Sequence, residues 1–144
     1  MSEENKVKAR RAYEEGWGEG RLEVFNEVYA TDFVYHDPVD PEVCSREDYE
    51  QWVSAARIMW PDVHITIEEI FADGDKVVAR GTMGGTHREG SIGGVPATGK
   101  KATWTWISIF HFAGGKIVEL WNNYDSFGLL QQLGIITLPE GSEG

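Results

Sequence analysis

Apolar side chains recur at helical spacing over the first 60 residues of the chain. Ala9, Tyr13 and Trp17 are four residues apart and predict one apolar face of an N-terminal helix. The glycine-rich stretch at residues 16–20 is expected to end that helix, and residues 33–38 are expected to form a short extended segment that proline stops. A second short helix is expected between them, with apolar positions at Phe25, Val28 and Tyr29.

The clearest helix begins after Ser45. Ser45 is a good N-cap residue, and Glu47 and Asp48 place negative charge in the first turn. Pro61 ends the helix after Trp60. Its apolar positions fall at i, i+3, i+4, i+7 and i+10, at Tyr49, Trp52, Val53, Ala56 and Met59.

The second half of the chain alternates between apolar and polar residues, as strands do. Turn signals at residues 73–75 and 113–115 indicate hairpins, and residues 88–101 form a glycine-rich connection. A final short helix is expected over residues 126–133, with Gly134 as its C-cap. Strands are expected at residues 64–72, 76–87, 102–112 and 116–124.

Helices followed by strands in hairpins predict an α+β fold with an antiparallel sheet. Glycines near the end of the 76–87 strand allow a sheet to curl. We therefore expect a cone, in which the N-terminal helices wrap a curved sheet around an apolar cavity. One domain is expected to span residues 1–144, with residues 1–4 and 137–144 flexible.

Composition narrows the classes of function. Of the 144 residues 41% are hydrophobic, and six Trp, five Tyr and six Phe suit an aromatic-lined pocket. The net charge of −11 repels nucleic acids and anionic membranes, and we expect neither as a partner. The N-terminus has no apolar run, so no signal peptide and a cytoplasmic location are expected. The lone Cys44 can form no internal disulfide.

The last strand carries the most informative polar residues. Alternation places residues 117, 119, 121, 123 and 125 on one face and residues 118, 120, 122 and 124 on the other. Both faces mix apolar and polar side chains, so periodicity leaves open which face is inside. Asp125 has two interpretations: an acid with a raised pKa in an apolar cavity, or the cap of the helix that starts near Ser126.

Histidines and tryptophans supply further candidates. His87 ends the long strand and is either a hydrogen-bond partner in the pocket or an exposed residue, and His36 has the same two interpretations. The histidines are dispersed without helical ligand spacing, so we expect no metal. The chain also has no phosphate-binding loop and no GxGxxG motif after a strand, and we expect no cofactor. Trp104 and Trp106 share one face of a strand and, with Trp60, form either core packing or a wall that binds a flat ring.

Several motifs together resemble one family. The run Gly85-Thr86-His87, followed by GVPATGKK at residues 94–101, is similar to a stretch of the SnoaL-like polyketide cyclases and their ester-cyclase relatives. The same holds for IFHFAGGKIVE at residues 109–119 and DSFGLLQQLG at residues 125–134. Trp60-Pro61-Asp62 and residues 35–38 also fit, and the similarity covers residues 5–136.

The resemblance implies a fold and an activity. The fold is the cone-shaped α+β barrel of the nuclear-transport-factor-like superfamily. The activity is ring closure in an aromatic polyketide by intramolecular aldol condensation, without metal or cofactor. An acidic residue near the end of the last long strand serves there as acid and base, and Asp125 matches it. His87 and His36 match positions that face the cavity.

These implications define a candidate site for a hydrophobic small molecule. Asp125 and His87 are the expected catalytic residues. The remaining pocket residues are expected to donate hydrogen bonds or to stack on a planar substrate; they are His36, Trp60, Trp104, Trp106, Trp121 and Asn123. The alternatives are a non-catalytic binding module, an isomerase, and an epoxide hydrolase that uses Arg80 and Asn123. A homodimer or higher oligomer is expected through an apolar convex face of the sheet.

Overall fold

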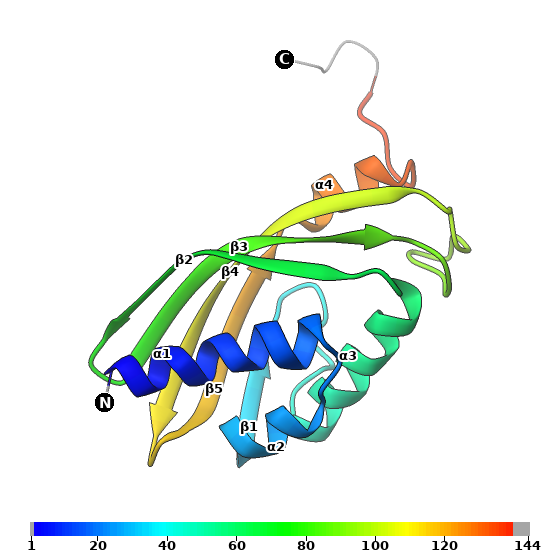
Figure 1. Cartoon of the computed structure of the whole chain (residues 1–144). Helices are drawn as coiled ribbons and strands as arrows, with labels where there is room; N and C mark the ends of the chain where they lie inside the picture. Colours follow the sequence, from blue (N-terminus) through cyan, green and yellow to red (C-terminus); the bar gives the residue numbers. More distant parts are fainter. Residues whose placement is uncertain (1, 140–144) are drawn as a thin grey trace.

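The computed structural model describes residues 2–139 and has the predicted α+β architecture (Figure 1). In this part of the chain five strands form one curved, unclosed sheet in the order β1-β5-β4-β3-β2. The elements are α1 (Ser2–Arg11), η1 (Ala12–Gly18), α2 (Glu23–Val28), β1 (Tyr29–His36), α3 (Arg46–Met59), β2 (His64–Asp73), β3 (Lys76–Thr86), β4 (Lys101–Ala113), β5 (Lys116–Tyr124) and α4 (Ser126–Gln132).

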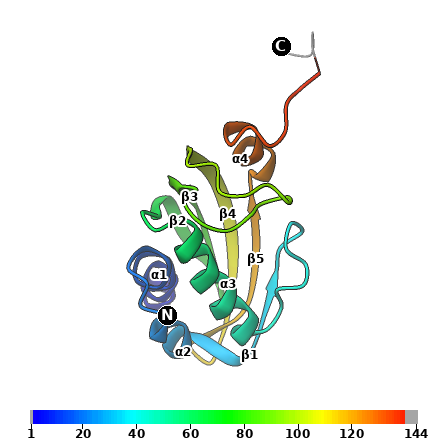
Figure 2. The ribbon, with the colours of Figure 1, turned by 90° about the vertical axis from the view of Figure 1, so that its right-hand side faces the viewer.

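The helices occupy two places on this sheet. Figures 1 and 2 show α1, α2 and α3 on its concave side and α4 beyond the ends of β4 and β5. Of the ends predicted to be flexible, residue 1 and residues 140–144 lie outside the described residues, whereas residues 2–4 belong to α1. No helix within residues 2–139 is long and apolar enough to cross a membrane.

The N-terminal helix ends within the glycine-rich stretch that the sequence predicts. The expected apolar face of Ala9, Tyr13 and Trp17 is buried, but the helix passes through Gly16 as the π-helical segment η1. Gly16 serves close packing here, because a Cβ at this position would lie 2.5 Å from the Phe25 ring. Gly16 therefore lets α2 approach η1, and the helix ends at Gly18.

The helix predicted after Ser45 is confirmed, together with its cap. The Ser45 hydroxyl accepts a hydrogen bond from the Asp48 N–H at 3.0 Å, and the Asp48 carboxylate accepts one from the Ser45 N–H at 3.1 Å. This reciprocal capping box fixes where α3 begins. The helix buries Tyr49 and Val53 and ends at Met59.

One edge of the sheet differs from the prediction. Strands β2 to β5 pair antiparallel as expected, but β1 pairs parallel with β5. The strand also begins at Tyr29, which the sequence pattern assigned to a helix. Tyr29 stacks between Phe25 and Phe33, with ring centroids 5.2 and 4.3 Å apart, and such local contacts fit either conformation. Pairing with the edge of β5, which is distant in sequence, therefore decides that Tyr29 belongs to a strand.

A bulge in β5 decides which side chains face inward. Phe112 pairs with Ile117 and His111 with Glu119, so Val118 is an extra residue on β5. Ile117 and Leu120 are both buried as a result. Beyond the bulge, alternate residues starting from Leu120 face the concave side, which settles the choice that periodicity left open.

The convex face of the sheet carries exposed apolar side chains. Ile107 is 55% exposed, and Ile109, Trp121 and Val34 are exposed on the same face of β4, β5 and β1. We call these four residues the outer patch. Self-association stays a prediction, and the outer patch is the surface on which it is tested.

We expect the wild type to form a dimer through the outer patch and Ile107→Glu to weaken it at least tenfold. Burial of an unpaired carboxylate in an interface costs more than about 1.4 kcal/mol. Size-exclusion chromatography with light scattering at micromolar concentrations measures the change. Phe127→Glu on α4 is the control, because Phe127 is also exposed but lies outside the patch. A monomeric wild type contradicts the prediction.

Candidate functional site

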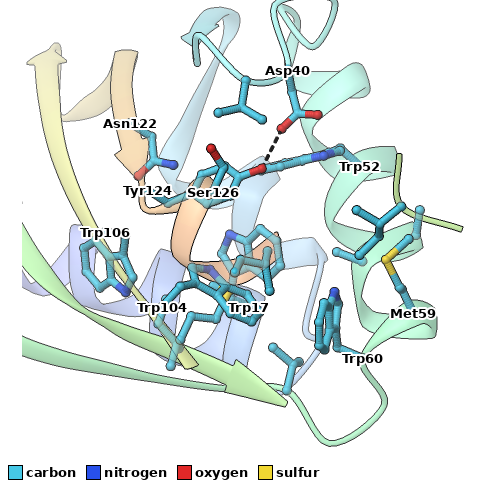
Figure 3. Close-up of a pocket in the computed structure, with 18 of the residues that line it drawn as sticks. Trp17, Asp40, Trp52, Met59, Trp60, Trp104, Trp106, Asn122, Tyr124 and Ser126 are labelled. Carbon is cyan, nitrogen blue, oxygen red and sulfur yellow. Dashed lines mark hydrogen bonds between the residues drawn. The ribbon is translucent and has the colours of Figure 1, made fainter. Parts of the chain in front are cut away.

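A cavity of about 480 Å³ lies between the concave face of the sheet and the helices (Figure 3). Volumes of this order are usual for small-molecule sites. Its walls are largely aromatic, and nearly every part of the chain contributes to them. The aromatic residues that line it are Tyr13, Trp17, Tyr35, Tyr49, Trp52, Trp60, Trp104, Trp106 and Tyr124.

Three predicted pocket residues line this cavity. Trp104 and Trp106 project inward from alternate positions of β4, and both are buried. Trp60 is the C-cap residue of α3 and packs against Trp104 with ring centroids 5.0 Å apart. The predicted aromatic wall is therefore present at one side of the cavity, and binding of a flat ring to it stays a prediction.

A chain of hydrogen bonds runs along the base of the cavity. The Ser108 hydroxyl donates to the Asn122 side-chain oxygen at 2.7 Å, so the Tyr13 hydroxyl, 2.5 Å away, donates to Ser108. Asn122 in turn donates through its amide nitrogen to Asp37 at 3.3 Å. Each side chain in this series donates a hydrogen bond to the next one, and the last acceptor is the Asp37 carboxylate.

Asp37 is a buried carboxylate, 4% exposed, that polar donors surround. Besides Asn122, the Tyr35 hydroxyl donates to it at 2.8 Å and the Val39 N–H at 2.9 Å. Within residues 2–139 no basic side chain forms an ion pair with it. These three donors replace the water that the carboxylate loses on burial.

Asp40 is the acid that lines the cavity. Its side chain is partly buried and accepts a hydrogen bond from the Tyr124 hydroxyl at 3.3 Å (Figure 3). Burial and the negative charge of Asp37 raise the pKa of Asp40 above its ordinary value, and the bond from Tyr124 partly opposes this. Burial also raises the pKa of Tyr124, so this hydroxyl keeps its proton and remains a donor. A carboxyl in this environment is suited to proton transfer.

Sequence reasoning missed Asp40 because its place depends on tertiary structure. The loop that carries it follows β1, and only the parallel pairing of β1 with β5 brings that loop beside Tyr124. The available local signal was a pair of acids, Asp37 and Asp40, each followed directly by proline in a short connection.

Asp125 does not line the cavity. Asp125 is exposed and its carboxylate accepts a hydrogen bond from the Gly128 N–H at 2.9 Å, which makes it the N-cap of α4. Its own N–H donates to the Thr105 carbonyl at 3.0 Å and holds it at the end of the sheet. The capping interpretation is the one that the structure shows, and a catalytic role for Asp125 stays a prediction that this position does not support.

Three more predicted pocket residues lie on the convex face instead. The His36 ring stacks on Trp121 with centroids 4.8 Å apart, and its Nε2 lies 2.7 Å from the Glu119 carboxylate. Asn123, two residues further along β5, is exposed on the same side. The bulge at Val118 is the reason, since it turns Trp121 and Asn123 away from the cavity.

His87 is fully buried but does not line the cavity. Its Nδ1 accepts a hydrogen bond from the Thr98 N–H at 3.2 Å, so its Nε2 carries the proton and donates to the Gly90 carbonyl at 2.8 Å. These bonds fix the loop after β3, whose residues 91–93 close part of the cavity. His87 thus holds a wall in place, and a catalytic role for it stays a prediction.

The alternative sites are not assembled in residues 2–139. Arg80 is exposed and pairs with Glu69 at 2.7 Å, so it does not meet Asn123 across a cavity as an epoxide hydrolase would need. Within the same residues no group of three or more His, Cys, Asp or Glu side chains is placed to hold a metal ion.

Comparison with known proteins agrees with this architecture. The sequence model of the SnoaL-like polyketide cyclase family matches residues 7–133. Among solved structures, IdmH of Streptomyces antibioticus, a proposed polyketide cyclase, is 30% identical with a TM-score of 0.79, over 90% of this chain and 98% of that one.

Two further structures are similar over nearly their whole length. A proposed polyketide cyclase from Acidithiobacillus ferrooxidans is 30% identical, with a TM-score of 0.81, over 93% of this chain and 96% of that one. AclR of Streptomyces galilaeus, a proposed hydroxylase, is 25% identical, with a TM-score of 0.82, over 95% and 100%. No curated protein matches the sequence.

The raised pKa of Asp40 predicts a stability effect that depends on pH. A carboxyl whose pKa is higher in the folded state stabilises the protein below its unfolded pKa, and this stabilisation is lost as the pH rises through the folded value. Asp40→Asn removes the charge, so its melting temperature relative to wild type should be higher at pH 7 than at pH 3. Thermal denaturation followed by circular dichroism measures this difference. A difference that is equal at both pH values, or larger at pH 3, contradicts the assignment.

Proposed function

The chain belongs to the SnoaL-like polyketide cyclase family, and on that premise we propose that it closes a ring in a hydrophobic carbonyl compound by intramolecular aldol condensation, with Asp40 as acid and base. The observation that carries this proposal is the partly buried Asp40 carboxyl in an aromatic cavity, with a pKa that burial and Asp37 raise. The proposal replaces Asp125, because that side chain lies outside the cavity.

The reaction needs one group that takes a proton and returns it. The Asp40 carboxylate removes a proton from the carbon beside a substrate carbonyl, and the electron pair of that C–H bond forms an enolate. The enolate carbon attacks a second carbonyl carbon of the same molecule and forms the new C–C bond. The alkoxide that results takes the proton from the Asp40 carboxylic acid, which restores the carboxylate.

The surrounding side chains support each step. The Tyr124 hydroxyl orients the Asp40 carboxyl, and the raised pKa of Asp40 makes it a stronger base than an exposed aspartate. Asn122 has a second amide hydrogen beyond the one that it gives to Asp37, and it lines the cavity. The aromatic walls surround a bound substrate with apolar surface, and displacement of water by the substrate would strengthen these interactions.

The names of the similar proteins favour a cyclase without deciding it. Two of them are proposed polyketide cyclases, whereas AclR is a proposed hydroxylase. One fold can therefore serve more than one chemistry. The isomerase and the non-catalytic binding module are the remaining alternatives, and the binding module predicts ligand binding without any proton transfer.

Deuterium exchange tests the base directly. We expect the protein to accelerate exchange of the acidic C1 protons of 2-tetralone, a bicyclic ketone, in deuterated buffer at neutral pH. Asp40→Asn should lose at least about 100-fold of that acceleration, the usual contribution of a general base. Proton NMR follows the loss of the C1 signal.

Asp125→Asn is the matched control for this experiment. It removes the carboxylate that directly follows Tyr124 but keeps a good N-cap residue on α4, so exchange should stay at the wild-type rate. Loss of exchange in Asp125→Asn, with full exchange in Asp40→Asn, would return the catalytic role to Asp125. A wild-type protein that binds 2-tetralone without accelerating exchange would favour the binding module.

Tyr124→Phe tests the hydrogen bond to the base. This bond lowers the pKa of Asp40, so its removal should raise that pKa further. The acidic limb of the pH–rate profile for exchange should then move to higher pH, because a larger fraction of Asp40 is protonated at each pH. An unchanged limb, with Asp40→Asn inactive, would show that Tyr124 does not act on the base.

A further inference from the structure

Asn122 is a cavity residue whose amide orientation is fixed by two buried neighbours. Its side-chain oxygen accepts a hydrogen bond from the Ser108 hydroxyl at 2.7 Å, and its nitrogen donates to the Asp37 carboxylate at 3.3 Å. A carboxylate only accepts hydrogen bonds, so the nitrogen of Asn122, and not its oxygen, lies toward Asp37. Ser108 is fully buried and Asp37 is 4% exposed. The amide therefore cannot turn over without the loss of two buried hydrogen bonds.

The packing around Ser108 stabilises this arrangement. Ser108 and Asn122 are directly paired on β4 and β5, and Tyr13 of η1 donates its hydroxyl proton to Ser108. The Tyr13 ring in turn packs against Trp106 and Phe110, with ring centroids 4.8 and 5.3 Å apart. Ser108 thus receives one proton from η1 and gives its own to Asn122. The amide is held in one orientation before any ligand binds.

The Asn122 nitrogen carries a second hydrogen that is available to a ligand. Asp37 accepts one N–H, and the described part of the chain offers this nitrogen no other acceptor. Asn122 is partly exposed and lines the cavity, whereas Ser108 and Asp37 are buried, so this network meets the cavity at Asn122. Figure 3 shows the amide nitrogen on the side of Tyr124 and Ser126, with the oxygen turned away from them.

The hydroxyl donors around Asn122 differ from it. The Tyr35 hydroxyl donates to Asp37, and the Tyr124 hydroxyl donates to Asp40, so neither proton is free for a ligand. Ser126 also lines the cavity, but within residues 2–139 no hydrogen bond fixes the rotation of its hydroxyl. A donor that is already oriented loses less entropy when it binds a ligand, which favours the Asn122 N–H over a rotating hydroxyl.

The place of Asn122 on β5 relates this donor to the proposed base. Asn122 and Tyr124 are alternate residues on the concave face of β5, so they lie about 7 Å apart along the strand. The Tyr124 hydroxyl bonds to Asp40. In a ketone the oxygen and the acidic carbon are attached to the same carbonyl carbon. A ketone can therefore accept a hydrogen bond from Asn122 while its acidic C–H is directed toward Asp40.

We infer that Asn122 is a specificity-determining residue whose second amide hydrogen donates a hydrogen bond to a ketone oxygen of the bound ligand. The ligand class is then an apolar ketone with its oxygen at Asn122 and its hydrocarbon part against the tryptophans of the cavity. The placement of the acidic C–H at Asp40 rests on the proposed function, whereas the hydrogen bond from Asn122 does not.

Side-chain NMR tests this hydrogen bond without any turnover. The ¹⁵N-labelled protein shows two proton signals for the Asn122 amide, and their absence in Asn122→Asp identifies them. Addition of 2-tetralone should move one of the two signals downfield, because only one hydrogen is free to bond the ketone. Addition of 2-methylenetetralin, which has a CH₂ group in place of the oxygen, should produce no such downfield shift.

Binding constants provide the second measurement. By titration calorimetry the wild type should bind 2-tetralone about tenfold more tightly than 2-methylenetetralin, because the alkene displaces water from the Asn122 N–H and offers it no acceptor. Asn122→Leu should abolish this preference. Asn123→Leu is the matched control, because it makes the same change one residue further along β5, on the exposed convex face, so the preference should persist.

Asn122→Asp guards against disruption of the network in Asn122→Leu. A protonated carboxyl has nearly the shape of the amide: its carbonyl oxygen can accept from Ser108, and its single O–H can donate to Asp37. This variant therefore keeps both buried hydrogen bonds and lacks only the second donor. Once circular dichroism shows that it is folded, it should bind the two probes with equal affinity.

Three results would overturn the inference: a preference for the ketone that survives in both Asn122 variants, Asn122 amide signals that the ketone does not shift, or a wild type that binds neither probe. Asp40→Asn should keep the preference, which separates this inference from the proposed function. A wild type that prefers the ketone but does not accelerate deuterium exchange would contradict the proposed function and leave the role of Asn122 supported.

Discussion

The extra residue in β5 is the constraint on which the site depends. Val118 has no partner on β4, and the strand absorbs it by presenting both Ile117 and Leu120 to the core. Every side chain beyond that point changes face relative to simple alternation from Ile117. Asn122 and Tyr124 therefore enter the cavity, and Trp121 and Asn123 face outward.

The electrostatics of the cavity arise from two acids with different surroundings. Asp37 lies deep and receives donors from Tyr35, Val39 and Asn122, so its charge is accommodated by the protein itself. Asp40, at the cavity wall, has the single bond from Tyr124 and the negative charge of Asp37 beside it. Two acids in one short loop thus differ in their surroundings. Polar donors surround Asp37, whereas burial and the charge of Asp37 raise the pKa of Asp40.

Local signals were sufficient for much of the fold. The Ser45 cap, the hairpin turns and the alternation of β2 to β4 each depend on residues close in sequence, and each appears where the pattern places it. The tryptophans of β4 follow from the same alternation. The parallel pairing of β1 and the role of Gly16 could not be predicted in this way, because both are set by contacts with distant elements.

The site was harder to predict than the fold for the same reason. Periodicity left open which face of β5 is inside, and Asp125 and His36 were sought in the cavity because the family resemblance implied it. Trp121 and Asn123 share the alternating face of Asp125 in the sequence pattern, and beyond the bulge that face is the outer one. Asp40 was overlooked because a loop residue has no periodicity to reveal its direction. The capping interpretation of Asp125 needed only the adjacent helix, and it is the one that the structure shows.

The cavity walls come from η1, β1, α3, β2, β3, β4, β5 and α4, so they include residues from early and late parts of the chain. A ligand that touches these walls bridges elements more than 100 residues apart in sequence, from Tyr13 to Leu129. Such a ligand binds only when all of these elements are assembled, and its binding energy adds to the folding equilibrium by mass action. At a concentration of 100 times its dissociation constant it adds about 2.7 kcal/mol. The unfolding temperature of the protein therefore rises when a ligand occupies the cavity, and this rise can rank unknown ligands before any reaction is identified.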